Sequence, residues 1–186
     1  RHVAAHPDRF LKATAVADLD RAVSSRKIGL LYYTQNATPI QDELGRLKTL
    51  YDLGVRIVQL TYNTRNLVGD GCLERTNAGL STFGVAVVER MNAMRMLVDV
   101  SHCGEATTLD GIRISSRPVA ITHAGCKAVF DHPRNKTDQV LRELAAKGGV
   151  IGIYQINPYL GPKERNNLDD YLRHVDHAIN VAGIDH

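Results

Sequence analysis

The segment MLVDVSHCGEATTLDGIRISSRPVAITH, residues 96–123, decides the fold. It begins with a short apolar, β-branched run that leads to His102, and it closes with a second such run that leads to His123. Between the two runs lies a helix-like segment at residues 105–115. A short strand, a helix and another short strand form the repeating unit of parallel sheets that are covered by helices.

The same pattern recurs along the chain and gives five strand–helix units. The other three apolar runs are Ile28–Tyr33, Val55–Leu60 and Val150–Tyr154. The helices expected after the five runs are 39–53, 83–94, 105–115, 137–147 and 168–181. The first of these is expected to begin at Pro39 and to end at Gly54, which suits a C-cap. A sixth unit is expected at Ala13–Arg21, with its strand upstream.

Polar residues mark the points where the predicted strands end. Gln35, Tyr62, His102 and His123 all lie there. The polar ends of parallel strands converge on one face in a barrel, whereas an open doubly wound sheet would spread them along a crevice. No GxGxxG motif follows the first run, which counts against a dinucleotide site. We therefore predict an α/β fold, a partial (β/α)8 TIM-type barrel of five or six βα units, truncated at both ends.

Composition excludes several classes of protein. The 186 residues are 44% hydrophobic and 23% charged, with a net charge of +3, which is typical of a globular chain and not of a disordered one or a coiled coil. No apolar run reaches the roughly 18–20 residues that a membrane span needs. Basic residues do not cluster into a patch for nucleic acid. We expect a single domain over residues 1–186, with no nucleic acid and no membrane span.

The cysteines indicate a reducing compartment. Cys72, Cys103 and Cys126 are odd in number and form no CxxC motif, so we interpret them as reduced thiols. This predicts a cytoplasmic protein. Export is left open, because the chain begins at Arg1 and not at a methionine.

Two histidines form the candidate metal site. His102 and His123 are separated by one βα unit, and adjacent parallel strands lie about 4.8 Å apart. Their imidazoles can therefore meet at one ion, and imidazole is a common zinc ligand. The alternative is that each ring only hydrogen-bonds a loop backbone. Gln35 offers a weak third ligand through its amide oxygen, whereas strand alternation turns Asp99 to the opposite face as a structural carboxylate.

Further candidates lie on the following loops. Arg134 comes just after His123 and suits a substrate carboxylate, because guanidinium pairs with it through two parallel hydrogen bonds; the alternative is an exposed arginine in a turn. Tyr154 and Tyr159 end the fifth run, where they either line the same face or pack.

At these residues the chain resembles the membrane (renal-type) dipeptidase family, zinc metallopeptidases on an amidohydrolase-like barrel. The resemblance covers roughly residues 27–186, and its motifs agree in order and spacing. They are Leu60–Asn63, Gly79–Gly84, Val87-Val88, Met91-Asn92, Leu97–His102, Arg117–Val119, Thr122-His123 and Asp131–Asn135.

The resemblance implies a metallodipeptidase that hydrolyses the peptide bond of dipeptides with a metal-activated water. It implies that His102 and His123 bind one metal, that Arg134 holds the substrate carboxylate and that Tyr159 lies near the substrate. The implied cofactor is Zn²⁺, as one or two ions, and a homodimer is one assembly that this interpretation allows.

Two positions depart from the family pattern. The family's bridging glutamate falls on Gln35, whose neutral amide is expected to weaken the second metal. Its substrate-contacting histidine falls on Tyr62, which donates a hydrogen bond to substrate but is a poor proton shuttle at neutral pH. Tyr62 is thus the candidate catalytic and substrate-binding residue.

The resemblance also leaves alternatives open. The family's His-x-Asp ligand pair is expected upstream of Arg1 and its active-site aspartate beyond His186, so we expect residues 1–186 to be an internal fragment of a metal-dependent hydrolase barrel with an incomplete site. One alternative is a barrel amidohydrolase for another amide or a lactam. The other, suggested by Gln35 and Tyr62, is a non-catalytic barrel homologue.

Overall fold

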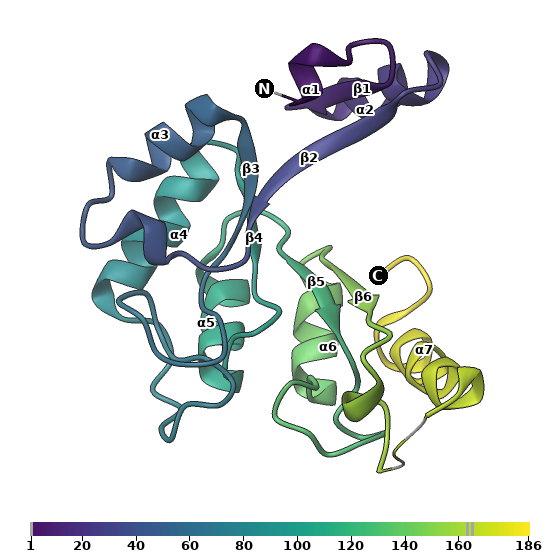
Figure 1. The fold of residues 1–186 in the computed structure, drawn as a ribbon. Helices are drawn as coiled ribbons and strands as arrows, with labels where there is room; N and C mark the ends of the chain where they lie inside the picture. Colours follow the sequence, from purple (N-terminus) through teal and green to yellow (C-terminus); the bar gives the residue numbers. More distant parts are fainter. Residues whose placement is uncertain (1, 163, 165) are drawn as a thin grey trace.

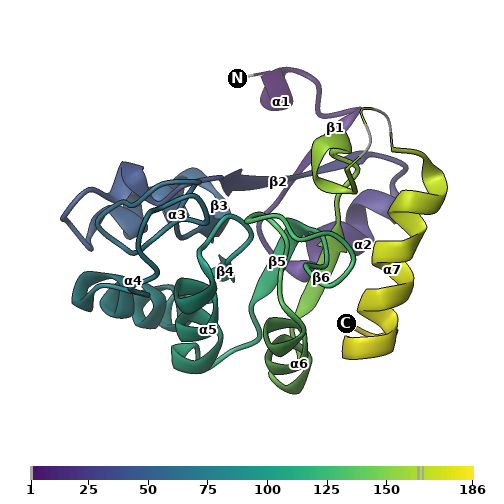
Figure 2. The same ribbon diagram turned by 90° about the horizontal axis from the view of Figure 1, so that it is seen from below.

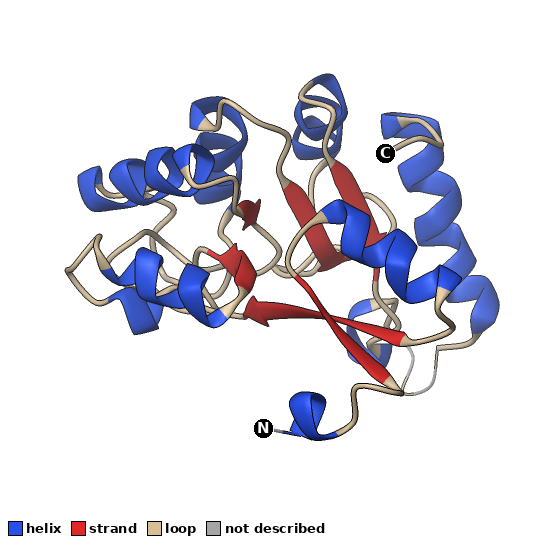
Figure 3. Ribbon diagram, turned by 90° about the horizontal axis from the view of Figure 1, so that it is seen from above, coloured by secondary structure: helices blue, strands red, loops and turns tan. Residues whose placement is uncertain are grey.

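The computed structural model of this chain describes residues 2–162, 164 and 166–186. Six parallel strands form one sheet in the order β1-β2-β3-β4-β5-β6. The strands are β1 (Phe10–Ala13), β2 (Ile28–Thr34), β3 (Val55–Gln59), β4 (Leu97–Asp99), β5 (Ala120–Ala124) and β6 (Val150–Ile153). The sheet curls, and helices surround its outer side (Figure 3). This half-barrel confirms the partial TIM-type barrel that the sequence predicts.

A helix follows each strand, as Figures 1 and 2 show. The α-helices are α1 (His2–Ala5), α2 (Val16–Ser24), α3 (Arg46–Leu53), α4 (Thr82–Ala93), α5 (Glu105–Ile114), α6 (Asp138–Ala146) and α7 (Leu168–Ala182), with 3₁₀ turns η1 (Thr38–Ile40) and η2 (Asn157–Tyr159). The sixth unit exists, with its strand β1 ending at Ala13 and its helix α2 starting at Val16, three residues after the start of the unit expected at Ala13–Arg21.

Helix ends follow local sequence signals. The side chains of Ser81, Thr137 and Asn167 accept hydrogen bonds from backbone N–H groups in the first turns of α4, α6 and α7, as N-caps do. Gly54 ends α3 with φ of 98°, a left-handed conformation that favours glycine. The predicted C-cap is therefore confirmed.

The helix expected to run from Pro39 is wrong in its first half. Pro39 lies in η1, and Gln41 then takes a φ of 51°. A positive φ ends the right-handed helical backbone, so α3 begins only at Arg46. Ile40 and Leu47 are nevertheless buried in the core, with Leu44 and Leu50 packed against it.

The core fills the space between the sheet and its helices. Strand residues such as Val58, Val98 and Ile121 belong to one buried cluster with Val87 of α4 and Leu144 of α6. Within the described residues, no helix is long and apolar enough to cross a membrane. Because all six strands run the same way, their carboxyl ends share one edge, and that edge carries the candidate site.

Candidate functional site

The three predicted metal ligands converge at the carboxyl ends of the strands. Gln35 follows β2, His102 lies in the turn after β4, and His123 is near the end of β5. The Nε2 atoms of the two histidines lie 2.9 Å apart. The side-chain nitrogen of Gln35 lies 3.0 Å from Nε2 of His123 and 3.4 Å from Nε2 of His102. Thus one ion can reach both imidazoles.

Hydrogen bonds fix the protonation of the His123 ring. The Thr122 hydroxyl donates to Asp99 Oδ2 at 2.7 Å and lies 2.8 Å from His123 Nδ1. Because the hydroxyl has one proton and gives it to the carboxylate, it accepts from Nδ1–H of the ring. The lone pair of the neutral imidazole is then on Nε2, which faces His102.

His102 is oriented in the same way by Asn63. Its Nδ1 lies 2.7 Å from Asn63 Oδ1, an amide oxygen that accepts the ring N–H. Asn63 is held by the neighbouring loop at Gly71, where a Cβ atom would come within 2.3 Å of the Tyr62 carbonyl oxygen and of the Asn63 carbonyl carbon. Gly71 therefore permits the close packing that places Asn63.

Burial keeps both imidazoles in the neutral form. It lowers the pKa of His102 to about 3, and the positive charge of Arg134 adds to the effect. Burial also lowers the pKa of His123, with Asp99 opposing the change in part. Neutral imidazole is the form that binds metals, so both rings are ready to bind an ion at neutral pH.

The donor set fits a metal ion in part. The 2.9 Å between the two Nε2 atoms is shorter than two Zn–N bonds of about 2.0–2.1 Å each, so both nitrogens reach a shared ion. Gln35 presents its amide nitrogen, which carries protons and is no ligand; a half-turn of the amide brings Oε1 into its place. Among the described residues, no group of three or more His, Cys, Asp or Glu side chains is placed to hold a metal ion.

Asp99 is buried, as expected of a structural carboxylate. Its Oδ1 accepts hydrogen bonds from the hydroxyl and the backbone N–H of Ser101, and its Oδ2 accepts from Thr122. Its contact with the site is indirect, through the hydroxyl that bonds His123.

Arg134 is buried and not exposed in a turn. It is 1% exposed, and it donates from Nη1 to the Ser101 carbonyl at 2.7 Å and from Nη2 to the His123 carbonyl at 3.2 Å. Its Nε is buried with no hydrogen-bond partner among the described residues. Arg134 therefore binds the main chain next to His102 and at His123, and it retains an unused donor.

The two candidate tyrosines differ in their surroundings. The Tyr62 ring stacks on His102 with centroids 4.1 Å apart and is 43% exposed, so it covers one side of the histidine pair. Tyr159 stacks on His132 at 4.3 Å and lies 5.6 Å from the Tyr154 ring. It is thus packed among aromatic rings, between His132 and Tyr154.

Sequence reasoning missed the residues that position the site. Asn63 stands in a quoted motif but carries no signal of its own role. Thr122 is visible as a small hydroxyl residue before His123, yet its bond to Asp99 exists only once β4 and β5 pair. Lys136 is buried beside the turn after β4 that carries His102, and nothing in the sequence indicates this position.

A comparison with protein families identifies a match along the whole chain. The family described as "Membrane dipeptidase (Peptidase family M19)" matches residues 1–186. The matched range includes all of the strands and the candidate site residues.

Individual relatives agree with this match. "Dipeptidase verJ" of Clonostachys rogersoniana is 33% identical over 97% of this chain and 47% of its own length. An amidohydrolase structure from Pseudomonas aeruginosa has a TM-score of 0.92 and 36% identity, over 97% of this chain and 55% of that one. A metallo peptidase structure from Rhodobacter sphaeroides, liganded with a phosphinate mimic of the dipeptide L-Ala-D-Ala, has a TM-score of 0.92 and 25% identity, over 98% of this chain and 55% of that one. The chain thus spans about half the length of these relatives.

Proposed function

Because this chain belongs to the membrane dipeptidase family, peptidase family M19, we propose that the full-length protein hydrolyses the peptide bond of dipeptides. The observation that carries the proposal is the pair of imidazoles whose Nε2 atoms lie 2.9 Å apart, each with its Nδ1 tied to an oxygen acceptor. Such a pair suits a cation, because a positive charge between two facing lone pairs removes their repulsion. In the described structure the amide nitrogen of Gln35 faces the same two lone pairs.

The metal in this proposal is Zn²⁺, and His102 and His123 would hold one such ion through their Nε2 atoms. Imidazole nitrogen suits Zn²⁺ among the common metals. Gln35 is neutral and supplies at most one oxygen. We therefore assign it to the same ion and propose that a second metal ion binds only weakly. A bound Zn²⁺ would supply a nucleophile from water near neutral pH and would polarise the peptide carbonyl.

The chain's own residues bind and orient the substrate. Arg134 offers its unpartnered Nε–H to the terminal carboxylate of a dipeptide, and a charge-assisted bond of this kind fixes the position of the peptide group. Tyr62, partly exposed beside His102, donates a hydrogen bond from its hydroxyl to the oxygen on which negative charge develops. Tyr159 lies near the substrate in this proposal, since its neighbour Tyr154 packs against the guanidinium of Arg134.

One observation favours a second candidate, an amidohydrolase for an uncharged amide or a lactam. Arg134 is 1% exposed, and two of its N–H groups already bind main-chain carbonyls. A substrate without a carboxylate needs no path to this buried guanidinium.

The test compares free dipeptides with their C-terminal amides in the full-length protein. We expect hydrolysis of the free dipeptides, loss of activity with a chelator, recovery with Zn²⁺ and slow turnover of the amides. Equal rates on both substrates favour the second candidate. No hydrolysis under any metal contradicts both candidates and favours a non-catalytic homologue.

A further inference from the structure

His102 is the third residue of a four-residue turn, Val100–Cys103. The Cys103 N–H donates to the Val100 carbonyl at 3.3 Å, which closes the turn. The turn follows β4 directly and leads into α5. Its backbone therefore sets where the His102 ring lies.

Every carbonyl of this turn has a donor from outside it. Lys136 Nζ donates to the carbonyls of Val100 and Cys103, both at 2.9 Å. Arg134 binds the Ser101 carbonyl, and the Cys72 backbone N–H donates to the His102 carbonyl at 2.8 Å. Lys136 thus binds both ends of the turn, while Arg134 and the Cys72 N–H bind its two middle residues.

Burying the ammonium group of Lys136 is unfavourable in free energy. The residue is 4% exposed, and its third proton goes to Thr108 Oγ1 at 2.8 Å. In the described part of the chain it has no ion pair with a carboxylate. A buried cation costs several kcal/mol unless its donors are satisfied, and the first turn of α5, where Thr108 lies, repels positive charge. The three acceptors offset this cost only if the turn keeps its shape.

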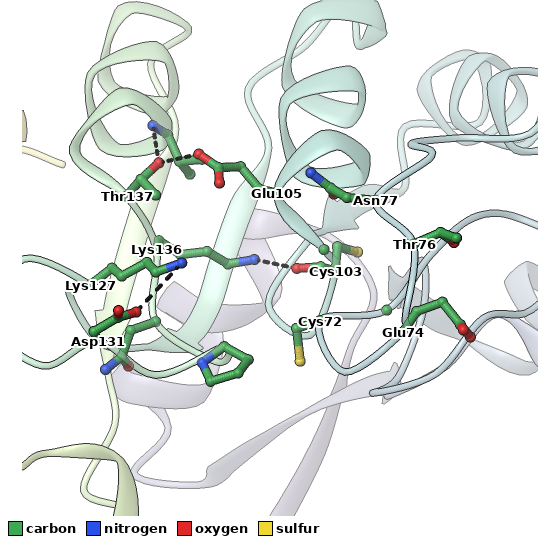
Figure 4. Close-up of a pocket in the computed structure, with 15 residues that line it drawn as sticks. Cys72, Glu74, Thr76, Asn77, Cys103, Glu105, Lys127, Asp131, Lys136 and Thr137 are labelled. Carbon is green, nitrogen blue, oxygen red and sulfur yellow. Dashed lines mark hydrogen bonds and ion pairs between the residues drawn. The ribbon is translucent and has the colours of Figure 1, made fainter. Parts of the chain in front are cut away.

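Lys136 also connects the turn to the other histidine. Its backbone N–H donates to the Gly125 carbonyl at 2.8 Å, and its own carbonyl accepts from the Lys127 N–H at 2.8 Å. Gly125 follows the end of β5, the strand that carries His123. The backbone of Lys136 is therefore fixed to the His123 strand, while its side chain reaches the His102 turn beside a cavity of about 220 Å³ (Figure 4).

We propose that Lys136 is a positioning residue that sets the separation of His102 and His123 by joining the end of β5 to the Val100–Cys103 turn. The role rests on the proposed function, because it matters only if the two imidazoles act together. Lys136 touches neither ring, so it acts through the backbone of the turn.

The test replaces Lys136 by methionine in the full-length protein, which keeps the length of the side chain and removes its donors. We expect Zn²⁺ affinity, measured by competition titration, to fall by about 10- to 100-fold, as for other residues that orient ligands. We also expect the ring ¹⁵N resonances of His102 in the protein without added metal to broaden or to report mixed tautomers, while those of His123 change little. The matched control is Lys127→Met, in the same loop and lining the same cavity, which should change neither readout.

A role in stability alone predicts a different result. In that case the Lys136→Met protein has a lower Tm, but its folded form keeps the wild-type Zn²⁺ affinity and His102 resonances, and the inference is overturned. If Lys136→Met does not fold, Thr108→Val removes one acceptor of the ammonium and should weaken Zn²⁺ binding in the same direction; unchanged binding also overturns the inference. If the wild-type protein binds Zn²⁺ but cleaves no dipeptide, the proposed function is refuted. The Zn²⁺ affinity and the His102 resonances of Lys136→Met then still decide whether Lys136 positions the two histidines.

Discussion

The hydroxyl of Thr122 donates a hydrogen bond to the buried carboxylate of Asp99, with 2.7 Å between Oγ1 and Oδ2. This bond decides which nitrogen of His123 carries a proton, because the hydroxyl oxygen then has only lone pairs to offer the ring. The candidate metal site thus depends on a carboxylate that contacts neither imidazole. Ligand histidines commonly have such partners, which fix the tautomer and the ring orientation.

Replacing Thr122 by valine should therefore disturb His123 without removing a ligand. Valine has the same shape but accepts no hydrogen bond, so Nδ1–H loses its acceptor and the Nε2–H tautomer becomes populated. We expect ring ¹⁵N shifts to show mixed tautomers at His123 and Zn²⁺ affinity to fall about 10-fold. Thr49→Val, on the exposed side of α3, is the control, and a single Nδ1–H tautomer in Thr122→Val argues against this account.

Gln35→Glu should strengthen metal binding. A glutamate brings an anionic oxygen to the position where Gln35 now presents its amide nitrogen, 3.0 Å from His123 Nε2. Equilibrium dialysis of the full-length protein with metal analysis should show tighter binding and more Zn²⁺ per chain. Gln35→Ala is the comparison, and it should retain the ion held by the histidines. No gain with glutamate means that Gln35 does not limit the site.

Arg134→Met should raise KM for free dipeptides by about 10- to 100-fold, the value of a lost charge-assisted hydrogen bond. Dipeptide amides should be affected far less, because they lack the carboxylate. Arg134 also holds the carbonyls of Ser101 and His123, so Zn²⁺ affinity has to be measured on the same variant. An equal rise in KM for both substrates, together with weaker Zn²⁺ binding, means that Arg134 only holds the backbone carbonyls and does not bind the substrate carboxylate.

Asp70 should make the loop before α4 sensitive to acid. A hydrogen bond from Arg65, with others from the Ala78 N–H and the Thr76 hydroxyl, lowers its pKa from 3.8 to about 2. Because the folded pKa lies below the unfolded one, this stabilisation is fully present above about pH 4 and is lost as the pH falls towards 2, amounting to about 2 kcal/mol.

The measurement is urea unfolding of wild type and Asp70→Asn between pH 5 and 2. The difference in unfolding free energy between the two proteins should shrink as the pH falls, since protonated Asp70 and asparagine are both neutral. A difference that stays constant with pH means that Asp70 does not titrate as described.

The sequence allowed the barrel and the meeting of the histidines to be predicted because both follow from periodic signals. Apolar runs before His102 and His123 locate two strands, and parallel pairing then brings their ends together. The prediction of a helix from Pro39 was wrong because Gln41 has a positive φ, and the spacing of apolar residues along the sequence does not reveal a positive φ. The burial of Arg134 was missed for a similar reason, because its acceptors are main-chain carbonyls far away in the sequence, at Ser101 in the turn after β4 and at His123 on β5.

The central claim is that His102 and His123 hold one shared ion, and it is tested most directly by the Zn²⁺ affinity of the full-length protein and of three variants. These are His102→Ala, His123→Ala and the double substitution, with His177→Ala on α7 as the control. We predict that each single variant loses more affinity than the roughly 10- to 100-fold typical of a residue that only orients a ligand, and that the double variant loses little more. Single variants that bind Zn²⁺ as wild type does, or losses that add as they do for independent sites, would contradict the claim.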